Sequence, residues 1–288
     1  MKLLLICPSN RASVSLLAES APLVAVPLLG QGLLEYWLAH IAGSGVKEAI
    51  VLADDRPAYI RAVAGNGARW GLNVTVIEES RELTPAQALL KYEKELGVGS
   101  AQNRIIVLDH FPNIPDKPLF TDYAAHFQSL LTWMSHARTP DRVGVKELMP
   151  GVYTDLRAHV SGDAKLRAPC WLGKNVYVGA GATVGPMSIV EDGSFIESGA
   201  LVSHSIVGPN TFVGKLAELS ESFALGDTLV NLKMGSVTKV PDNFLLSALR
   251  QPRSPQAAGF LERLAELCSR NLTEVQLLWK HFLMKKES

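Results

Sequence analysis

Few cysteines, few aromatic residues and no excess of either charge set the first limits on this chain of 288 residues. Its three cysteines, Cys7, Cys170 and Cys268, fit neither a disulfide framework nor a metal-binding motif. Because 28 basic residues balance 28 acidic ones, no field of one sign is available to hold phosphates or a membrane surface. We therefore expect no nucleic-acid partner and a reducing, cytoplasmic location.

The start of the chain also lacks a long apolar run. Residues 3–6 are apolar and follow a single lysine. This run is far shorter than the ~20 residues of a membrane-spanning helix, and it is too short for the core of a signal peptide. We expect no membrane span and interpret the run as a buried first strand.

What the sequence does contain is an internal repeat of six residues in its second half. Aliphatic residues occupy every sixth position at Val160, Leu166, Leu172, Val178, Val184, Val190, Ile196 and Val202. After a slip of one residue, the register resumes at Val207, Val213, Leu219 and Leu225. A fixed period of this kind is the signature of a repeat architecture.

A triangular parallel β-helix explains this period. Each flat face is one short strand and each corner is a tight turn, so one aliphatic side chain in six points into the interior. A β-sandwich has period two and irregular turn spacing, and it would not keep a six-residue register from Val160 to Val202. The pattern resembles the hexapeptide-repeat superfamily, and this resemblance implies a left-handed parallel β-helix at residues 151–247.

The first part of the chain, residues 1–145, alternates strand and helix signals. Strands are predicted at residues 3–6, 49–52, 74–77 and 104–108, and helices at residues 33–41, 57–64 and 85–96. Thr84 is suited to cap the last of these helices, which begins with Pro85. Such alternation predicts a parallel sheet, with ligands beyond the carboxyl ends of its strands.

Four stretches of this front domain resemble the sugar-phosphate nucleotidylyltransferases. They are residues 21–26 with 30–36, residues 45–51, residues 86–89 and residues 106–109. The resemblance implies a nucleotidyltransferase-like α/β domain in which Gln87 reads a nucleobase, Asp109 binds Mg²⁺ and Arg11 contacts phosphate. Many members of this family also carry a β-helix at the C-terminus, so the domain order agrees.

The phosphate loop and the catalytic lysine of the family are missing. The glycine-rich loop, whose amides hold the triphosphate, is replaced by Cys7-Pro8-Ser9-Asn10-Arg11, in which only Arg11 matches the signature arginine. Ala21 stands in place of the lysine that stabilises charge on the transferring phosphate.

The stretch between Asp109 and the repeat is also too short for the sugar-binding half of the family. A second magnesium ligand would have to be Asp116 or Asp122. A lone Asp109 would hold Mg²⁺ weakly, because sites of phosphate transfer usually have more than one anionic ligand.

We therefore expect a protein of sugar-nucleotide or envelope-polysaccharide metabolism that binds a nucleotide or nucleotide-sugar, with weak or lost transferase activity. The alternative is an active sugar-1-phosphate nucleotidylyltransferase that requires Mg²⁺. The candidate nucleotide-binding residues are Ser9, Asn10, Arg11 and Gln87. Arg11 and Asp109 are the candidate catalytic residues, and Asp109 is the candidate metal ligand.

A third hypothesis is acyl transfer by the repeat, with His159 or His204 as general base. Cys170 occupies a small-residue position of the repeat, which predicts a packed, inert thiol. Two amphipathic stripes at residues 253–288 predict a C-terminal helical cap on the open end of the β-helix. We also expect a homo-oligomer, either a trimer or a dimer.

Overall fold

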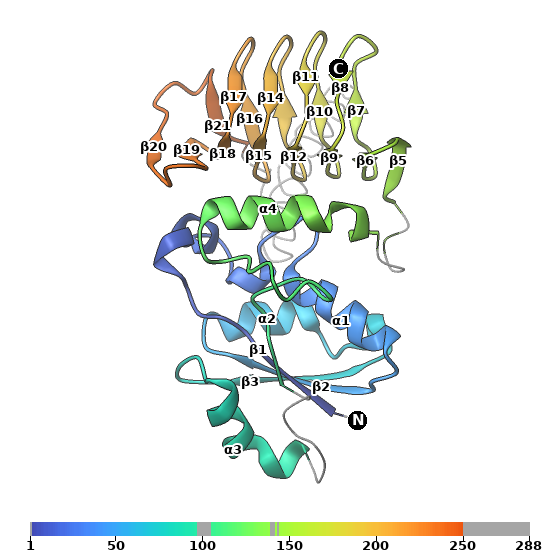
Figure 1. The fold of residues 1–288 in the computed structure, drawn as a ribbon, viewed down its shortest axis with the longest axis vertical. Helices are drawn as coiled ribbons and strands as arrows, with labels where there is room; N and C mark the ends of the chain where they lie inside the picture. Colours follow the sequence, from blue (N-terminus) through green and yellow to red (C-terminus); the bar gives the residue numbers. More distant parts are fainter. Residues whose placement is uncertain (1, 97–104, 139–141, 143, 250–288) are drawn as a thin grey trace, which may run out of the picture. The chain divides into compact units, whose positions relative to one another are not determined.

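The structure is a computed structural model that describes residues 2–96, 105–138, 142 and 144–249. Residues up to Leu249 belong to one compact unit, in which a small parallel sheet with helices is followed by three sheets of short strands (Figure 1). The predicted helical cap at residues 253–288 lies outside the described residues. No helix in the described ranges has the length and apolar character that crossing a membrane requires.

The front domain contains a four-stranded parallel sheet. Its strands are β1 (Lys2–Ile6), β2 (Glu48–Ala53), β3 (Asn73–Glu78) and β4 (Ile105–Val107), in the order β3-β2-β1-β4. The helices are α1 (Leu33–Gly43), α2 (Pro57–Ala64), α3 (Pro85–Leu96) and α4 (Tyr123–Trp133). The helices predicted at residues 57–64 and 85–96 are confirmed in α2 and α3. Helix α4 was not predicted from the sequence.

The two faces of this sheet bury different sets of side chains, because alternate residues of a strand point to opposite faces. Leu3 and Leu5 of β1 lie in the core that includes residues of α1 and α2, whereas Leu4 and Ile6 lie in a core with Ala88 of α3. Figure 1 accordingly shows α1 and α2 on one side of the sheet and α3 on the other.

The strand order reverses between β1 and β4. From β1 the chain moves outward to β2 and β3, and then returns to the opposite side of β1 to form β4. In open α/β sheets, ligands bind beyond the carboxyl ends of the strands at such a reversal. Ser9 and Arg11 follow β1, and Asp109 follows β4, so these predicted site residues flank the reversal.

The remaining strands, β5 to β21, are here called the coil. Their bounds are β5 (Lys146–Met149), β6 (Val152–Thr154), β7 (His159–Val160), β8 (Lys165–Leu166), β9 (Cys170–Leu172), β10 (Tyr177–Val178), β11 (Thr183–Val184), β12 (Ser188–Val190), β13 (Phe195–Ile196), β14 (Leu201–Ser203), β15 (Ser205–Val207), β16 (Thr211–Val213), β17 (Glu218–Ser220), β18 (Ser222–Leu225), β19 (Thr228–Asn231), β20 (Val237–Lys239) and β21 (Leu246–Ala248).

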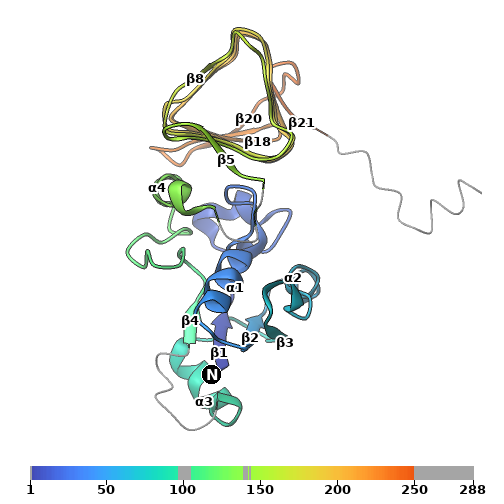
Figure 2. The same ribbon diagram turned by 90° about the vertical axis from the view of Figure 1, so that its right-hand side faces the viewer.

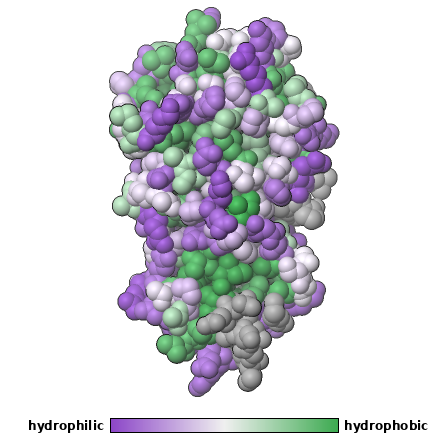
Figure 3. Space-filling model, viewed as in Figure 1, coloured by the Kyte–Doolittle hydropathy of each residue, from purple (hydrophilic) through white to green (hydrophobic). Residues whose placement is uncertain are grey.

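From β6 to β18, each strand pairs in parallel with the strand three places further along the chain. These pairings build three sheets. Viewed end-on in Figure 2, successive turns of the chain superimpose on a triangle. This arrangement is compatible with the predicted β-helix, whose hand stays a prediction. On the face shown in Figure 3, polar and apolar residues are interspersed over the coil, whereas a continuous apolar area lies over the front domain.

The interior of the coil is filled by the residues that the six-residue period predicted. Eight of these positions are fully buried, namely Leu172, Val178, Val184, Val190, Ile196, Val202, Val207 and Val213. They belong to one hydrophobic cluster that is separate from the core of the front domain. The inward orientation predicted for these residues is therefore confirmed.

The slip in the repeat lies at a corner of the triangle. Ser188 pairs with Cys170 on one side and with Ser205 on the other, so the turn that ends at Ser205 is one residue shorter. The shorter turn passes through His204, whose φ of 50° lies in the left-handed region. The next turn is equally short, and as a result Val207 pairs with Ala224. The inward position predicted for Leu225 is wrong, because Ala224 occupies it.

One face of the coil joins the front domain through an outward row of apolar side chains. Trp171, Ile189, Ile206 and Phe223 stand in register on neighbouring strands and belong to the same hydrophobic core as α1 and α4. The Phe223 ring lies 6.1 Å from the ring of Tyr123 and 6.5 Å from that of His126, both in α4. The two parts thus share a continuous core.

Candidate functional site

The loop after β1 donates hydrogen bonds to a carboxylate of the segment after β3. Arg11 donates from Nη1 to Glu82 Oε2 and from Nη2 to Glu82 Oε1, both at 2.7 Å. The Ser9 backbone N–H donates to the same Oε2 at 2.9 Å. A guanidinium and a backbone amide that converge on one anion form the kind of arrangement that also holds a phosphate. Here Glu82 occupies that position.

Two further carboxylates, those of Asp54 and Asp109, lie near this loop. Asp54, which follows β2, accepts a short hydrogen bond from the Ser9 hydroxyl. The hydrogen bond to Glu82, together with the negative charges of Glu82, Asp109 and Asp54, raises the pKa of Arg11 above its ordinary value. The surroundings of Arg11 are therefore acidic, and a bare phosphate would be repelled unless cations accompanied it.

The pKa of Glu82 reflects two opposing effects. Burial acts to raise it, but the hydrogen bonds from Arg11 and from the Ser9 N–H outweigh burial and lower it below 4.5. Glu82 is thus held as a carboxylate. Cys7, at the start of the loop, is buried, and burial together with the charges of Asp54 and Glu82 raises its pKa, so it is no thiolate nucleophile.

Asp109 lies two residues beyond the end of β4, close to the strand end at which the sequence placed it. Its Oδ1 is 2.6 Å from Nδ1 of His110, and its side chain is 47% exposed. Among the described residues, no group of three or more His, Cys, Asp and Glu side chains could hold a metal ion. Asp122 instead caps α4 by accepting the Ala125 N–H at 2.7 Å. The role of Asp109 as a magnesium ligand stays a prediction.

Gln87 and Asn10 do not join the cluster of Arg11 and Glu82. The Gln87 side chain accepts the Thr84 N–H at 3.1 Å, and the Thr84 hydroxyl accepts the Gln87 N–H at 3.3 Å. This reciprocal pair is a capping box, so Gln87 stabilises the start of α3. Both Gln87 and Asn10 are exposed. The role of Gln87 in reading a base stays a prediction.

Sequence reasoning missed Asp54 and Glu82. Both lie just beyond the carboxyl ends of strands, where side chains from separate segments converge, and this position was an available signal. The contact between Glu82 and the loop after β1 was not predictable, because it depends on the path of two irregular segments.

The candidate residues of the repeat are dispersed. His159 stacks on Tyr177 with ring centroids 5.3 Å apart, and stacking continues from Tyr177 through Phe195 to Phe212. His204 lies at the shortened corner. Cys170 is fully buried, and burial raises its pKa to about 12, as expected for a packed thiol.

A tight turn before α1 connects the front domain to the coil. Leu29 and Gly30 both have left-handed φ values, of 54° and 81°, and the Leu28 N–H donates to Gln31 O at 2.8 Å. The N–H groups of Leu29 and Gly30 donate to Glu191 of the coil at 2.5 and 2.8 Å. Burial, followed by the charge of Asp192, raises the pKa of Glu191 to about 8.

A buried ion pair lies beside this turn. Arg142 Nη2 is 2.5 Å from Asp155 Oδ2, and both side chains are less than a tenth exposed. Arg142 also donates to Leu29 O at 2.5 Å and lies over the Trp171 ring, 5.2 Å from its centroid. The turn is therefore held by two side chains of opposite charge, because Glu191 accepts hydrogen bonds from its N–H groups and Arg142 donates one to Leu29 O.

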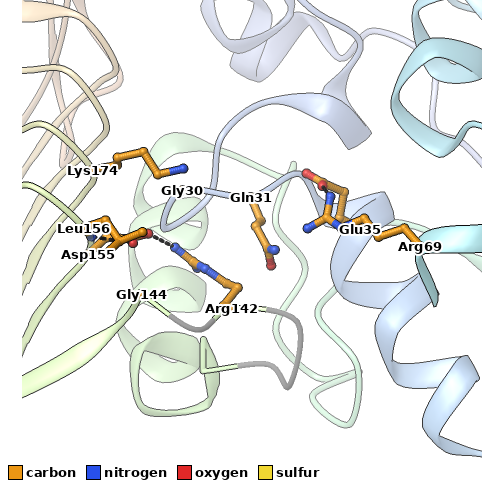
Figure 4. A pocket seen from close by; sticks show the side chains of 9 residues that line it. All are labelled: Gly30, Gln31, Glu35, Arg69, Arg142, Gly144, Asp155, Leu156 and Lys174. Atoms are coloured by element: carbon orange, nitrogen blue, oxygen red, sulfur yellow. Dashed lines mark hydrogen bonds and ion pairs between the residues drawn. The ribbon is translucent and has the colours of Figure 1, made fainter.

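A polar pocket with a volume of about 280 Å³ opens next to the turn (Figure 4). Its lining residues are Gly30, Gln31, Glu35, Arg69, Arg142, Gly144, Asp155, Leu156 and Lys174. They come from the front domain, from the segment that precedes β5 and from the coil. None of the site residues predicted from the sequence lines this pocket.

Comparisons with known proteins give limited similarity. No family model matches the chain. It is 28% identical over 97 residues to a glucose-1-phosphate thymidylyltransferase from Streptomyces antibioticus, a match that covers 34% of this chain and 27% of that protein. The chain thus spans about a quarter of the length of this curated relative.

Among solved structures, a mutant perosamine N-acetyltransferase from Caulobacter crescentus, in complex with CoA and GDP-perosamine, is 12% identical. The match covers 66% of this chain and 95% of that one. Its TM-score of 0.19 carries no argument about fold or function.

Proposed function

We propose that the chain is a nucleotidyltransferase-like protein of sugar-nucleotide metabolism that binds a nucleotide or nucleotide-sugar with weak or no transfer activity. The binding site is the edge of the front sheet where β1 and β4 end. The observation that carries this proposal is the convergence of Arg11 and the Ser9 N–H on the Glu82 carboxylate. These donors form an anion site beside the reversal in strand order.

Weak transfer follows from the charges at the same edge. Ala21 is buried and supplies no cation where the family has its lysine. Asp54, Glu82 and Asp109 place negative charge around Arg11. Because catalysis of this class depends on positive groups that stabilise the transferring phosphate, such an edge favours binding over turnover.

The choice of ligands comes from the similarity to the thymidylyltransferase. That protein is named for glucose 1-phosphate and a thymidylyl group, so thymidine nucleotides and a thymidine-diphosphate sugar are the first ligands to test. The matching stretch is short, so other nucleotides belong in the same panel.

The test combines binding with turnover. Calorimetric titration of the full chain with nucleoside triphosphates and nucleotide-sugars, with Mg²⁺, should detect binding of at least one of them. Glu82→Gln should strengthen this binding about tenfold or more, because it removes a competing charge and releases Arg11. Glu78→Gln is the matched control, since Glu78 is an exposed residue at the end of β3 with only a 3.5 Å ion pair.

Pyrophosphate release from the same nucleotides and sugar-1-phosphates measures transfer. We expect little or none in the wild type. Rapid release that Asp109→Ala abolishes would instead identify an active nucleotidylyltransferase. Unchanged nucleotide affinity in Glu82→Gln, or no binding across the panel, would contradict the proposed site.

A further inference from the structure

Another pocket is lined by α1 and by the short 3₁₀-helix Met134–His136 that follows α4. Its volume of about 390 Å³ lies within the ~300–1,000 Å³ range of small-molecule pockets. The lining residues are Tyr36, Ala39, His40, Pro112, Trp133, Ser135, His136 and Arg138. None of them lines the pocket beside the Leu28–Gln31 turn or belongs to the cluster of Arg11 and Glu82.

Stacked rings form one wall of this pocket. Trp133 stacks on Phe111 with ring centroids 4.8 Å apart, and on His136 with ring centroids 5.4 Å apart. Tyr36 packs against Trp133 with the edge of one ring toward the face of the other. Phe111 is fully buried, whereas His136 is exposed. His136 is therefore the member of this stack that a ligand can reach.

Arg138 supplies the only permanent charge of the lining, because a guanidinium is not deprotonated in proteins. No carboxylate lines the pocket, and no ion pair reaches Arg138 from the part of the chain that the structure describes. Burial and the charge of Glu147 raise the pKa of Tyr153, and the charge of Arg138 opposes them. Glu147 itself accepts the Gly151 N–H at 2.8 Å and forms no ion pair with Arg138. The guanidinium is thus available to an anionic ligand.

An unpaired donor lies in the same wall. Trp133 is only 6% exposed, and its buried Nε1–H has no acceptor among the described residues. Such a donor is unfavourable in a folded protein, so this wall favours a ligand that carries an acceptor. Next to it, Ser135 Oγ lies 3.2 Å from Nδ1 of His136, a contact that orients the His136 ring.

We propose that this pocket binds a planar aromatic carboxylate. The ring of the ligand stacks on His136 and so extends the stack of Phe111 and Trp133. Its carboxylate pairs with Arg138, because the planar fork of a guanidinium matches the two oxygens of a carboxylate. One permanent positive charge suits a monoanion, whereas a phosphate monoester carries a charge of about −1.5 to −2 at neutral pH. This proposal does not rest on the proposed nucleotide site.

Calorimetric titration of the full chain tests the proposal, with naphthalene-2-carboxylate, its neutral carboxamide, acetate and inorganic phosphate as probes. Naphthalene-2-carboxylate should bind more tightly than the other three. Arg138→Gln should weaken its binding about tenfold or more, because it removes a charge-assisted pair. Arg138→Lys keeps the charge but not the fork, so its affinity should lie between those of the wild type and Arg138→Gln.

His136→Ala should weaken the binding of naphthalene-2-carboxylate and leave the far weaker binding of acetate unchanged, because only the ring of the ligand stacks on His136. Arg138 and His136 are both exposed, so these variants should keep the melting temperature of the wild type. Arg167→Gln is the matched control, since Arg167 is an exposed arginine of the coil that does not line the pocket. It should leave the affinity unchanged.

Three results would overturn the proposal. The first is a carboxamide, acetate or phosphate that binds as tightly as naphthalene-2-carboxylate. The second is an affinity that Arg138→Gln does not change. The third is binding that is lost in Arg11→Gln but kept in Arg138→Gln, which would assign the anion to the sheet edge.

Discussion

Arg11 and Glu82 belong to segments that follow different strands of the front sheet, yet their side chains form a two-point ion pair with both N–O distances at 2.7 Å. The Ser9 N–H donates to one of the same oxygens. This is the geometry in which a guanidinium binds a carboxylate or a phosphate. An anionic ligand of the loop must therefore compete with a carboxylate of the protein itself.

The contribution of Glu82 to stability should depend on pH. Its pKa is lowered in the folded protein, so the stabilisation is present above 4.5 and is lost as the pH falls through the lowered pKa. Since both side chains are partly exposed, we expect Glu82→Gln to cost only about 0.5–1 kcal/mol at pH 7. Urea unfolding from pH 7 to 3 should show this difference shrinking. A constant difference over that range would contradict the assignment.

Glu191 should show the opposite dependence. Its pKa is raised to about 8, so its stabilising contribution is complete below its ordinary value of 4.5 and is lost as the pH rises toward 8. For one such group the loss is at most about 1.4 kcal/mol per pH unit. We expect the free energy of unfolding of the wild type, relative to Glu191→Gln, to fall between pH 5 and 8. Parallel curves for the two proteins would rule this out.

The apolar row between the front domain and the coil should make their unfolding cooperative. Ile189 is fully buried in the core that the two parts share, so Ile189→Ala should cost about 2–5 kcal/mol. The loss should appear in a single calorimetric transition. Thr183→Ala, a change at a half-buried position on another face of the coil, should cost much less. Two separate transitions in the wild type would contradict a continuous core.

Gly185 should tolerate no side chain. A Cβ atom there would lie 1.9 Å from the Arg167 carbonyl oxygen of the preceding turn, and its φ of 100° is unfavourable for other residues. Gly185→Ala should therefore reduce the yield of folded protein strongly. Gly181→Ala is the control, because Gly181 also has a positive φ but no atom within 4 Å of the added Cβ, and it should cost about 1–2 kcal/mol. Equal effects of the two changes would show that the close contact is unimportant.

Much of this fold could be predicted because it depends on regular spacing. The inward positions from Leu172 to Val213 follow the six-residue period, and α2 and α3 begin at the prolines that marked them. The first shortened corner, between Val202 and Val207, was visible in the period. Leu225 was misplaced because the corner at Glu221 is shortened as well, and Ala224 and Leu225 are both apolar, so the pattern did not show this second slip.

The site was less predictable because it is assembled from irregular segments. Asp109 and Arg11 could be placed at the sheet edge, since each lies within five residues of the end of a strand. The contact of Glu82 with Arg11, and that of Glu191 with the turn at Leu29 and Gly30, join residues far apart in the chain. No local pattern encodes such contacts, so only the path of the loops reveals them.

The shortened corner at His204 bears on how relatives of this chain should be aligned. Strand pairing continues unchanged past this corner although the turn has one residue fewer. Insertions and deletions of single residues should therefore accumulate at corners during evolution, while the faces keep their length. An alignment that enforces a strict six-residue window would misassign every position after residue 204, and one anchored on strand partners would not.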